Sequence, residues 1–307
     1  MSKHIVMTGG TGLIGTRLTR ELLKRGDRVT VLTRNPDRAR DTLPDGTEAL
    51  RWLSDENDDD WSGAIDGADA VVHLAGESIA EERWTDEYKK RMYDSRIDTA
   101  AKLIDAIARA EKKPEVMISV SAVGYYGDTG DRDIDENSSA GDDFLAELCV
   151  AWETEAKKAE HYGVRVVIPR MGLVLARSGG ALEKLLTPFK MFAGGPVGNG
   201  EQWFPWIHLA DAIGIFLHAI DNPSVHGPLN AVAPGLVRNR EFAVALGDAL
   251  DRPAKFSVPA FVIKLAMGEL GEMLLGGQHA EPRRTLESDY DFKYATIESA
   301  LEDLVGD

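Results

Sequence analysis

Apolar and polar positions along the first two thirds of the chain follow two patterns that alternate. Short runs rich in β-branched residues predict strands, and longer stretches with apolar residues three or four apart predict helices. The predicted strands are residues 5–8, 29–33, 70–74, 116–120 and 164–168, and the predicted helices are 17–25, 88–110 and 144–162. Strands that alternate with helices form a parallel sheet covered on both faces. We therefore predict an α/β fold, a Rossmann-like doubly wound parallel sheet.

The pattern changes after Pro169. Glycines and prolines cluster at residues 179–180 and 194–200, which predicts loops over a ligand cleft. Helical patterns return at residues 210–220, 239–250, 260–267 and 297–304. We expect residues 1–170 to form a nucleotide-binding domain whose sheet is completed by later segments. Residues 171–307 are expected to form a smaller α+β substrate lobe with a C-terminal segment.

A glycine-rich stretch lies between the first predicted strand and the first predicted helix. Residues 8–15 read Thr-Gly-Gly-Thr-Gly-Leu-Ile-Gly. Glycines at this point allow a tight turn and a close approach of the backbone to a pyrophosphate, whose charge the helix N-terminus stabilises. A glycine-rich turn without a ligand is the alternative. The predicted cofactor-binding residues here are Gly9, Thr11, Gly12, Leu13, Ile14 and Gly15.

The end of the second predicted strand indicates which dinucleotide binds. An NAD enzyme commonly has Asp or Glu there to bind the ribose 2′-hydroxyl group. This chain has Leu-Thr-Arg-Asn at residues 32–35, with no acid. The guanidinium group of Arg34 can instead bind a 2′-phosphate, although it could also be a solvated surface side chain. We predict NADP(H), bound with the help of Thr33 and Arg34.

The Gly-x-x-Gly-x-x-Gly spacing resembles that of the short-chain dehydrogenase/reductase superfamily, whose extended branch includes nucleotide-sugar epimerases. Three further stretches are similar to motifs of that branch: His-Leu-Ala-Gly at 73–76, Pro169-Arg170, which follows the strand predicted at residues 164–168, and Pro-Trp-Ile-His-Leu-Ala-Asp at 205–211. The resemblance implies further cofactor contacts from Leu74, Ala75, Gly76, Ser121, Pro169 and Arg170.

A narrower resemblance covers essentially the whole chain. Residues 74–79, 94–97 and 121–127 resemble an atypical subfamily whose members are labelled epimerase-family or nucleoside-diphosphate-sugar-epimerase-like proteins. Residues 292–304 resemble the C-terminal segment of unassigned role that those proteins carry. This resemblance implies an oxidoreductase or epimerase-like activity on a small polar substrate such as a nucleotide sugar.

The usual catalytic pair of the superfamily is missing. That pair is a Tyr followed four residues later by a Lys, whose charge helps the phenol to transfer a proton near neutral pH. No tyrosine of this chain has a lysine four residues further on. The expected helix, aligned on Glu153, has Leu145 in place of Tyr and Cys149 in place of Lys. The alternative function is therefore a non-catalytic NADPH-binding sensor or structural protein.

Other polar residues could carry the chemistry. Ser121 could orient a substrate carbonyl, and the candidate proton donors are Tyr126, Glu77 and His208, in that order. Each also has a structural alternative: a local backbone bond for Ser121, packing for Tyr126, a helix cap for Glu77 and a hydrogen-bonded structural role for His208. The predicted substrate-binding residues are Arg96, Gln202 and Trp206.

Composition limits the partners. The chain has 51 acidic and 35 basic residues, a net charge of -16, so we expect no nucleic-acid partner. One cysteine rules out an internal disulfide, and the dispersed histidines predict no metal site. No apolar run approaches the ~18 residues of a membrane span, so no membrane partner is expected. Without a signal-peptide pattern, we expect a cytoplasmic protein with a small-molecule substrate. A homodimer is left open.

Overall fold

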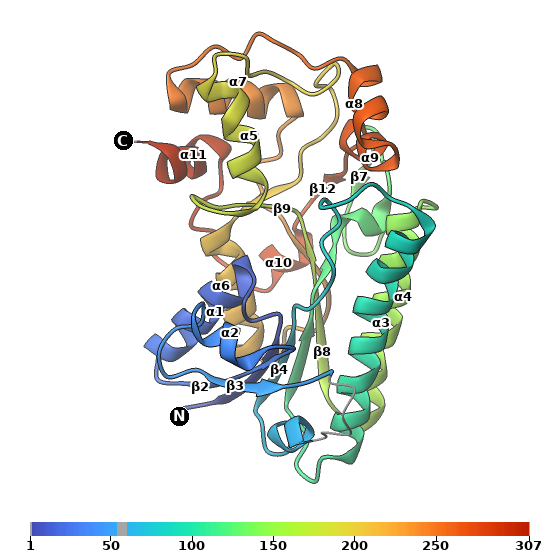
Figure 1. The fold of residues 1–307 in the computed structure, drawn as a ribbon, viewed down its shortest axis with the longest axis vertical. Coiled ribbons are helices and arrows are strands. Elements are labelled where there is room, and N and C mark those ends of the chain that lie inside the picture. Colours follow the sequence, from blue (N-terminus) through green and yellow to red (C-terminus); the bar gives the residue numbers. More distant parts are fainter. Residues whose placement is uncertain (1, 54–59, 307) are drawn as a thin grey trace.

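A parallel sheet is the central element of the computed structural model, which describes residues 2–53 and 60–306 (Figure 1). Its principal strands are β1 (His4–Thr8), β2 (Arg28–Thr33), β3 (Glu48–Arg51), β4 (Ala70–His73), β5 (Val116–Ser119), β8 (Arg165–Met171) and β11 (Gly227–Ala231). They lie side by side in the order β11-β8-β5-β4-β1-β2-β3, and the short β6 (Ser121–Ala122) also pairs with β8. The strand order changes direction at β1, so β1 and β4 flank the point where an open α/β sheet binds its ligand.

Helices cover both faces of this sheet. On one face lie α1 (Leu13–Lys24), α2 (Pro36–Arg40) and α6 (Leu209–Asp221), and on the other lie α3 (Asp86–Arg109), α4 (Phe144–Lys157) and the short η3 (Lys158–Tyr162). The side chains of β1 alternate between the two cores. Ile5 and Met7 pack with α1 and α6, whereas Val6 packs with α3. Residues 5–7 of β1 form an uninterrupted apolar run because both faces of this strand are buried.

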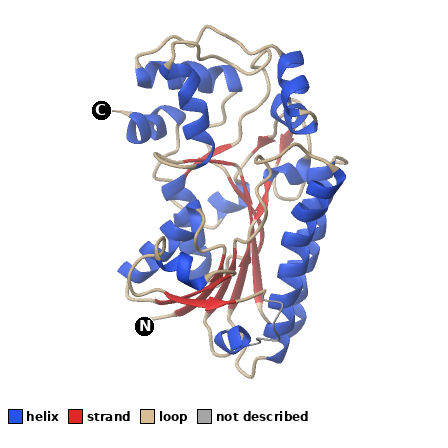
Figure 2. Cartoon of the chain, in the orientation of Figure 1, coloured by secondary structure: helices blue, strands red, loops and turns tan. Residues whose placement is uncertain are grey.

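The lobe is built mainly from helices (Figure 2). Its elements are β9 (Leu173–Leu175), α5 (Gly180–Lys190), β10 (Trp206–His208), α7 (Asn239–Leu250), α8 (Ala260–Met267), α9 (Glu269–Leu275), β12 (His279–Ala280), α10 (Arg283–Glu287) and α11 (Ile297–Val305). β9 pairs with β10, and β12 pairs with β7 (Asp133–Ile134). Two further short helices, η1 (Asp60–Ala64) and η2 (Val123–Tyr126), lie in connections of the nucleotide-binding half. Leu182, Phe242 and Leu301 bring α5, α7 and α11 into one apolar core.

The sequence prediction of the doubly wound sheet is confirmed, with three local corrections. α1 begins at Leu13 rather than at residue 17, so its first turn contains Leu13 and Ile14 of the glycine-rich stretch. Gly180, predicted to lie in a loop, begins helix α5, in which Leu182, Leu186 and Phe189 recur at helical spacing on the buried side. A later segment, β11, pairs with β8 in this sheet.

Pro169 and Arg170 lie inside β8 and do not follow it. A proline within a strand normally removes a ladder hydrogen bond. Here β5 pairs with residues 165–167 of β8, and β6 pairs with residues 170–171. Pro169 therefore lies where β8 changes neighbours on this side, so the missing N–H leaves no gap in the ladder.

Within residues 2–53 and 60–306, every helix is too short or too polar to cross a lipid bilayer.

Candidate functional site

The glycine-rich loop between β1 and α1 has the geometry of a phosphate-binding turn. Gly9 has a positive φ of 68°, and a Cβ atom added there would lie 2.7 Å from the carbonyl carbon of Leu74. A Cβ added at Gly15 would lie 2.6 Å from Gly10 Cα. Gly12 begins α1 without a side-chain cap, so the first N–H groups of the helix remain available to an anion. The loop therefore fits a dinucleotide.

A groove of about 280 Å³ opens beside this loop. Its residues come from the loop and α1 (Thr11, Gly12, Leu13, Thr16, Arg17 and Arg20), from the segment after β9 (Ala176, Arg177 and Ser178) and from Leu209. The N-terminus of α5 follows this segment, and a Cβ atom added at Gly180 would lie 3.0 Å from the side chain of Leu13. In a chain of net charge -16, three arginines in one groove favour an anionic ligand.

Arg34 follows β2 directly and is exposed. Among the described residues, its guanidinium group has no hydrogen bond or ion pair, and neither has that of Arg38 on α2. The nearby acid, Asp37, pairs with Arg40 at 2.9 Å. Two cations without a carboxylate partner therefore lie where the adenosine ribose binds in this type of fold. This arrangement suits a 2′-phosphate.

The end of β4 is held to the end of β1 by a buried histidine. His73 Nδ1 lies 2.7 Å from Thr8 Oγ1, and that hydroxyl also accepts a hydrogen bond from the N–H of Ala75 at 3.3 Å. Burial lowers the pKa of His73 to about 4, so the ring is neutral near pH 7. His73 thereby fixes the segment of Leu74, Ala75 and Gly76 beside the glycine-rich loop, as expected for a residue with a structural role.

Arg96 and Glu77 lie together after β4. Arg96 donates to the carbonyl oxygens of Met92 (3.0 Å) and Glu77 (2.9 Å), and its guanidinium group lies 5.1 Å from the centre of the Trp152 ring. No carboxylate of the described chain forms an ion pair with it, and burial lowers the pKa of Arg96. The carboxylate of Glu77 is half-exposed and likewise unpaired. A charged guanidinium and a free carboxylate are thus available to a polar substrate.

Ser121 and Arg170 belong to a buried polar network. Arg170 forms a two-pronged ion pair with Glu153, with distances of 2.8 Å from Nε to Oε1 and 2.9 Å from Nη2 to Oε2. The hydroxyl of Ser121 donates to the same Glu153 at 2.9 Å. Ser121, Glu153 and Arg170 are each at most 2% exposed. Both candidate residues are therefore already satisfied within the protein, and Pro169 is buried beside them.

Tyr126, the first candidate proton donor, is also enclosed in this network. Its hydroxyl donates to Asn230 Oδ1 at 2.7 Å and accepts from Arg170 at 2.8 Å, and its side chain is 2% exposed. Burial raises the pKa of Tyr126 to about 12. The Tyr126 hydroxyl already donates to one protein group and accepts from another, and its ring packs against Ile134 and Val232. This geometry argues against Tyr126 as the proton donor.

The position of the missing Tyr and Lys is apolar. Leu145 is buried, and a Cβ atom at Gly124 would lie 3.4 Å from its Cβ. Cys149 is buried, and burial raises the pKa of its thiol to about 11. A thiol of that kind is neither a nucleophile nor a cation near neutral pH. Neither residue replaces the chemistry of the pair.

Two of the three predicted residues from segment 202–208 have structural positions. His208 caps α6, with Nδ1 accepting from the N–H of Ala210 at 3.0 Å, and its ring lies 3.9 Å from that of Tyr294. Burial lowers the pKa of His208. Trp206 is 1% exposed and donates to the Gly235 carbonyl oxygen at 3.0 Å. The geometry therefore argues against His208 as the acid and against Trp206 as a substrate contact.

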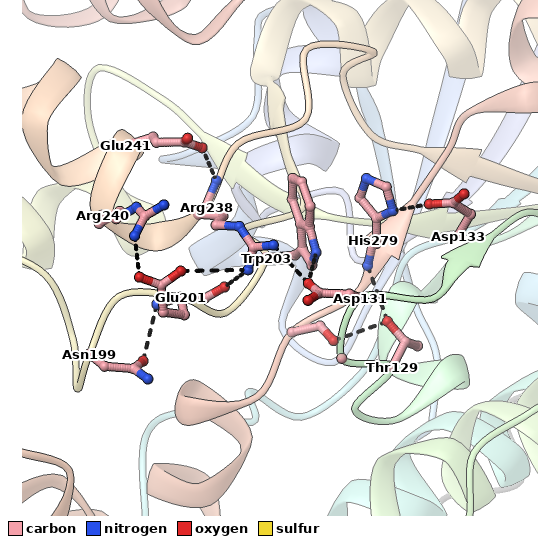
Figure 3. A network of polar contacts seen from close by, with 12 residues as sticks. Thr129, Asp131, Asp133, Asn199, Glu201, Trp203, Arg238, Arg240, Glu241 and His279 are labelled. Atoms are coloured by element: carbon pink, nitrogen blue, oxygen red, sulfur yellow. Dashed lines mark hydrogen bonds and ion pairs between the residues drawn. The ribbon is translucent and has the colours of Figure 1, made fainter.

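Gln202 precedes Trp203, which belongs to a polar network that fixes the glycine-rich loop of the lobe (Figure 3). Its side chain donates to the carbonyl oxygen of Val197 at 3.1 Å. The neighbouring Trp203 ring lies between the Arg238 guanidinium group, 4.5 Å from its centre, and the His279 ring, at 3.9 Å. Asp131 accepts from Trp203 (3.0 Å) and Arg238 (2.8 Å), and the bond from Arg238 lowers the pKa of Asp131. The loop is thus tied to the nucleotide-binding half.

Sequence reasoning missed four cationic groups, Arg17, Arg20, Arg38 and Arg177. Arg38 could have been found from the sequence, because it is a basic residue five positions after the end of β2. Arg177 had no local signal, since only the fold brings the segment after β9 to the glycine-rich loop. A larger groove, of about 650 Å³, lies between α7 and α11 and contains none of the predicted site residues. No group of three or more potential metal ligands occurs in the described ranges.

The fold and the glycine-rich loop define a dinucleotide-binding protein of the short-chain dehydrogenase/reductase type. The family model described as the NAD dependent epimerase/dehydratase family matches residues 5–232. A second model, described as a domain of unknown function (DUF1731), matches residues 258–304. The chain belongs to the NAD dependent epimerase/dehydratase family.

Relatives cover nearly the whole chain. The epimerase family protein SDR39U1 homolog, chloroplastic, of Arabidopsis thaliana is 41% identical over 299 residues, which are 97% of this chain and 85% of the relative. The Bacillus subtilis epimerase family protein YfhF is 35% identical over 99% of this chain and 98% of its own. The crystal structure of human epimerase family protein SDR39U1 with NADPH has a TM-score of 0.88 and 37% identity, covering 98% of this chain and 99% of that one.

Proposed function

We propose that this chain binds NADP(H) along the carboxyl ends of β1, β2 and β4. The observation that carries the proposal is the unpaired Arg34, which follows β2 where an NAD-specific protein commonly has an acid. The uncapped N-terminus of α1 and the groove beside it suit the pyrophosphate. The NADPH named for the human structure supports the same choice. Bound NADP(H) supplies or accepts a hydride at its nicotinamide ring.

We further propose an oxidoreductase or epimerase-like reaction on a small polar substrate that carries an anionic group, such as a nucleotide sugar. The substrate would lie between residues 1–170 and the lobe formed by residues 171–307, in a cytoplasmic protein. Arg96 would bind this anionic group, because an anion stabilises a partly buried guanidinium group that has no carboxylate partner in the protein. Glu77 would transfer the proton, since its carboxylate is free whereas Tyr126 and His208 are engaged.

Transfer of deuterium from the cofactor tests this reaction. The protein is loaded with NADPH deuterated at C4 in its pro-R or pro-S position, and the products formed from a desalted extract of small metabolites are followed by mass spectrometry. We expect label in a metabolite, or a shift between isomers where the label returns to the cofactor. Glu77→Gln should slow this turnover by about 10²- to 10⁴-fold and leave NADPH affinity unchanged. Unchanged turnover in Glu77→Gln would exclude Glu77 as the proton-transfer group.

A second candidate function is a sensor that binds NADPH without turnover. The observation that favours it is the replacement of the catalytic pair by Leu145 and Cys149, both buried. A sensor must bind NADPH and NADP⁺ with different affinities and change its shape or partner, whereas an enzyme binds both forms and turns over. NADPH binding without any label transfer or isomer change would favour the sensor.

A further inference from the structure

The most exposed large apolar side chains of the described residues belong to two neighbouring segments of the lobe. Leu265 is 76% exposed, Met191 72%, Phe261 71% and Phe256 60%. Phe192, Val258 and Val262 are exposed beside them along the chain. We call these seven side chains the lobe tip. Scattered exposed apolar residues are normal, but a concentration of this kind marks an interaction surface.

The lobe tip comes from two segments that pack against each other. Residues 184–200 contain the second half of α5 and the loop after it, and residues 252–268 contain the loop before α8 and α8 itself. The N–H of Phe256 donates to Gly194 at 3.1 Å, and the N–H of Val258 donates to Pro196 at 3.1 Å. The loop before α8 and α8 lie at the end of the molecule opposite the main sheet (Figure 1).

The charge of these two segments is opposite to that of the chain. Residues 184–200 and 252–268 contain no Asp or Glu, although the chain has 51 acidic residues in all. They contain the five cations Lys184, Lys190, Arg252, Lys255 and Lys264. Lys264 pairs with Glu272 at 3.3 Å, and Arg252 lies 4.5 Å from the centre of the Phe192 ring. Lys184, Lys190 and Lys255 have no ion-pair partner among the described residues.

We propose that the lobe tip docks onto the surface of an anionic lipid bilayer. Exposed aromatic and aliphatic side chains enter the boundary between headgroups and acyl chains, and adjacent lysines are attracted to anionic headgroups. α8 is eight residues long, so it can lie at this boundary and cannot cross the bilayer. The sequence led us to expect no membrane partner because no segment can span one. Docking at the surface does not require a span.

Charge also favours an anionic bilayer over a second copy of the chain as the partner of the lobe tip. A two-fold dimer through the lobe tip would bring the same five cations of both copies together, without an acid from either segment to compensate them. Like charges that face each other across an interface oppose binding. The anionic headgroups of a bilayer would instead compensate the charge of all five cations.

Sedimentation with unilamellar vesicles tests the proposal. We expect the protein to bind equimolar phosphatidylglycerol and phosphatidylcholine vesicles and to leave pure phosphatidylcholine vesicles unbound. The double variants Phe261→Ser/Leu265→Ser and Lys190→Glu/Lys255→Glu should each lower the partition coefficient by roughly tenfold or more. The matched controls are Val244→Ser/Leu286→Ser, which changes exposed apolar residues elsewhere, and Lys102→Glu/Lys157→Glu, which makes the same change in net charge. These should bind as the original protein does.

Circular dichroism and NADPH affinity, unchanged in all four variants, would show that they fold. Hydrogen exchange of residues 252–268 should slow on phosphatidylglycerol vesicles. Absence of vesicle binding would overturn the proposal, and so would an equal loss in the two charge variants, because net charge alone would then explain binding. Light scattering that reveals a dimer abolished by Phe261→Ser/Leu265→Ser would assign the surface to self-association instead.

Discussion

The side chains of Arg34 and Glu77 form no hydrogen bond or ion pair within the described protein, and the same is true of Arg17, Arg20 and Arg38 near the glycine-rich loop. Arg170 and Glu153 are the opposite case, a buried pair whose charges compensate each other. A buried pair fixes the protein around it, whereas an unpaired charge at the end of a strand is available to a ligand. Pairing therefore separates candidate ligand-binding residues from structural ones more clearly than residue type does.

Arg34→Ala is expected to weaken NADPH binding and to leave NADH binding unchanged. The lost group is a charge-assisted hydrogen-bond donor to the 2′-phosphate, so the NADPH dissociation constant should rise by about 10- to 100-fold. Titration calorimetry with both cofactors measures this. Arg40→Ala, which removes an arginine paired with Asp37, is the control and should change neither constant. If Arg34→Ala kept its preference for NADPH over NADH, Arg34 would not be the residue that binds the 2′-phosphate.

His73 gives a pH dependence at the same scale. Its pKa is about 4 in the folded protein and 6.5 when unperturbed, because burial disfavours the charged ring. The unfolded chain therefore binds this proton first as the pH falls below about 6.5, and the folded state loses stability down to about pH 4. The full loss is about 3 kcal/mol.

His73→Gln should remove this part of the acid sensitivity. The free energy of unfolding in urea is measured for both proteins at about pH 7 and about pH 4.5, where the original protein should lose about 2 to 3 kcal/mol more than the variant. Other acid-sensitive groups are common to both proteins, so the difference isolates His73. Equal losses in the two proteins would show that His73 carries its proton in the folded state.

At the scale of elements, the groove beside the glycine-rich loop lies between two helix starts. α1 begins at Leu13 without a side-chain cap, whereas at the start of α5 the Glu183 carboxylate accepts from the N–H of Gly179 at 2.9 Å. Arg177 lies just before α5, lines the groove and donates to the carbonyl oxygen of Asp303. It forms no ion pair with a described carboxylate. The uncapped start of α1 and the Arg177 guanidinium group, which has no ion-pair partner, therefore lie together where the pyrophosphate would bind.

Arg177→Ala should weaken NADPH binding by about 10- to 100-fold, because it removes a charged donor to the pyrophosphate. Adenosine 2′-monophosphate has no pyrophosphate, so its affinity should not change. Arg34→Ala should weaken both ligands, which makes the two variants controls for each other. If Arg177→Ala weakened both ligands equally, Arg177 would act on the fold or on the adenosine end of the site instead.

Periodicity was sufficient to predict the interior strands β1, β2, β4, β5 and β8, because strands buried on both faces are continuous apolar runs. It missed the edge strands. β3 reads Glu-Ala-Leu-Arg, and β11 begins with Gly-Pro, since an edge strand is less buried and tolerates polar residues and proline. α5 was missed because Gly179, Gly180 and Pro188 favour loops and so obscured the helical spacing of its apolar residues.

The site was predicted unevenly for a related reason. The glycine-rich loop and Arg34 are local features, so residues next to one another in sequence define them. Tyr126 depends on Asn230, more than a hundred residues away, and no local pattern reports that its hydroxyl is engaged. The same holds for His208, whose ring meets Tyr294 of the C-terminal segment. Roles that depend on distant partners require the fold.

At the scale of the whole molecule, one buried network joins three distant parts of the chain. The Glu136 carboxylate accepts from the N–H groups of Asn230 (2.9 Å) and Arg284 (3.1 Å). The Asn230 side chain accepts from Tyr126 and donates to the carbonyl oxygen of Glu281 at 2.8 Å. The network connects residues 126–136 (the end of η2, β7 and the residues after it), strand β11 and residues 281–284 at the start of α10. We therefore expect the nucleotide-binding half and the lobe to unfold together.

Asn230→Ala tests this cooperativity. The change leaves the Tyr126 hydroxyl and the Glu281 carbonyl without their buried partner, at a cost of about 2 to 4 kcal/mol of unfolding free energy. Hydrogen exchange in increasing urea, read for peptides of residues 5–120 and 173–304, should show both regions losing stability by the same amount. Asn137→Ala, at an exposed asparagine, should change neither. A loss confined to the peptides of the lobe would show two independent units, because the network would then support only the part of the chain that follows β8.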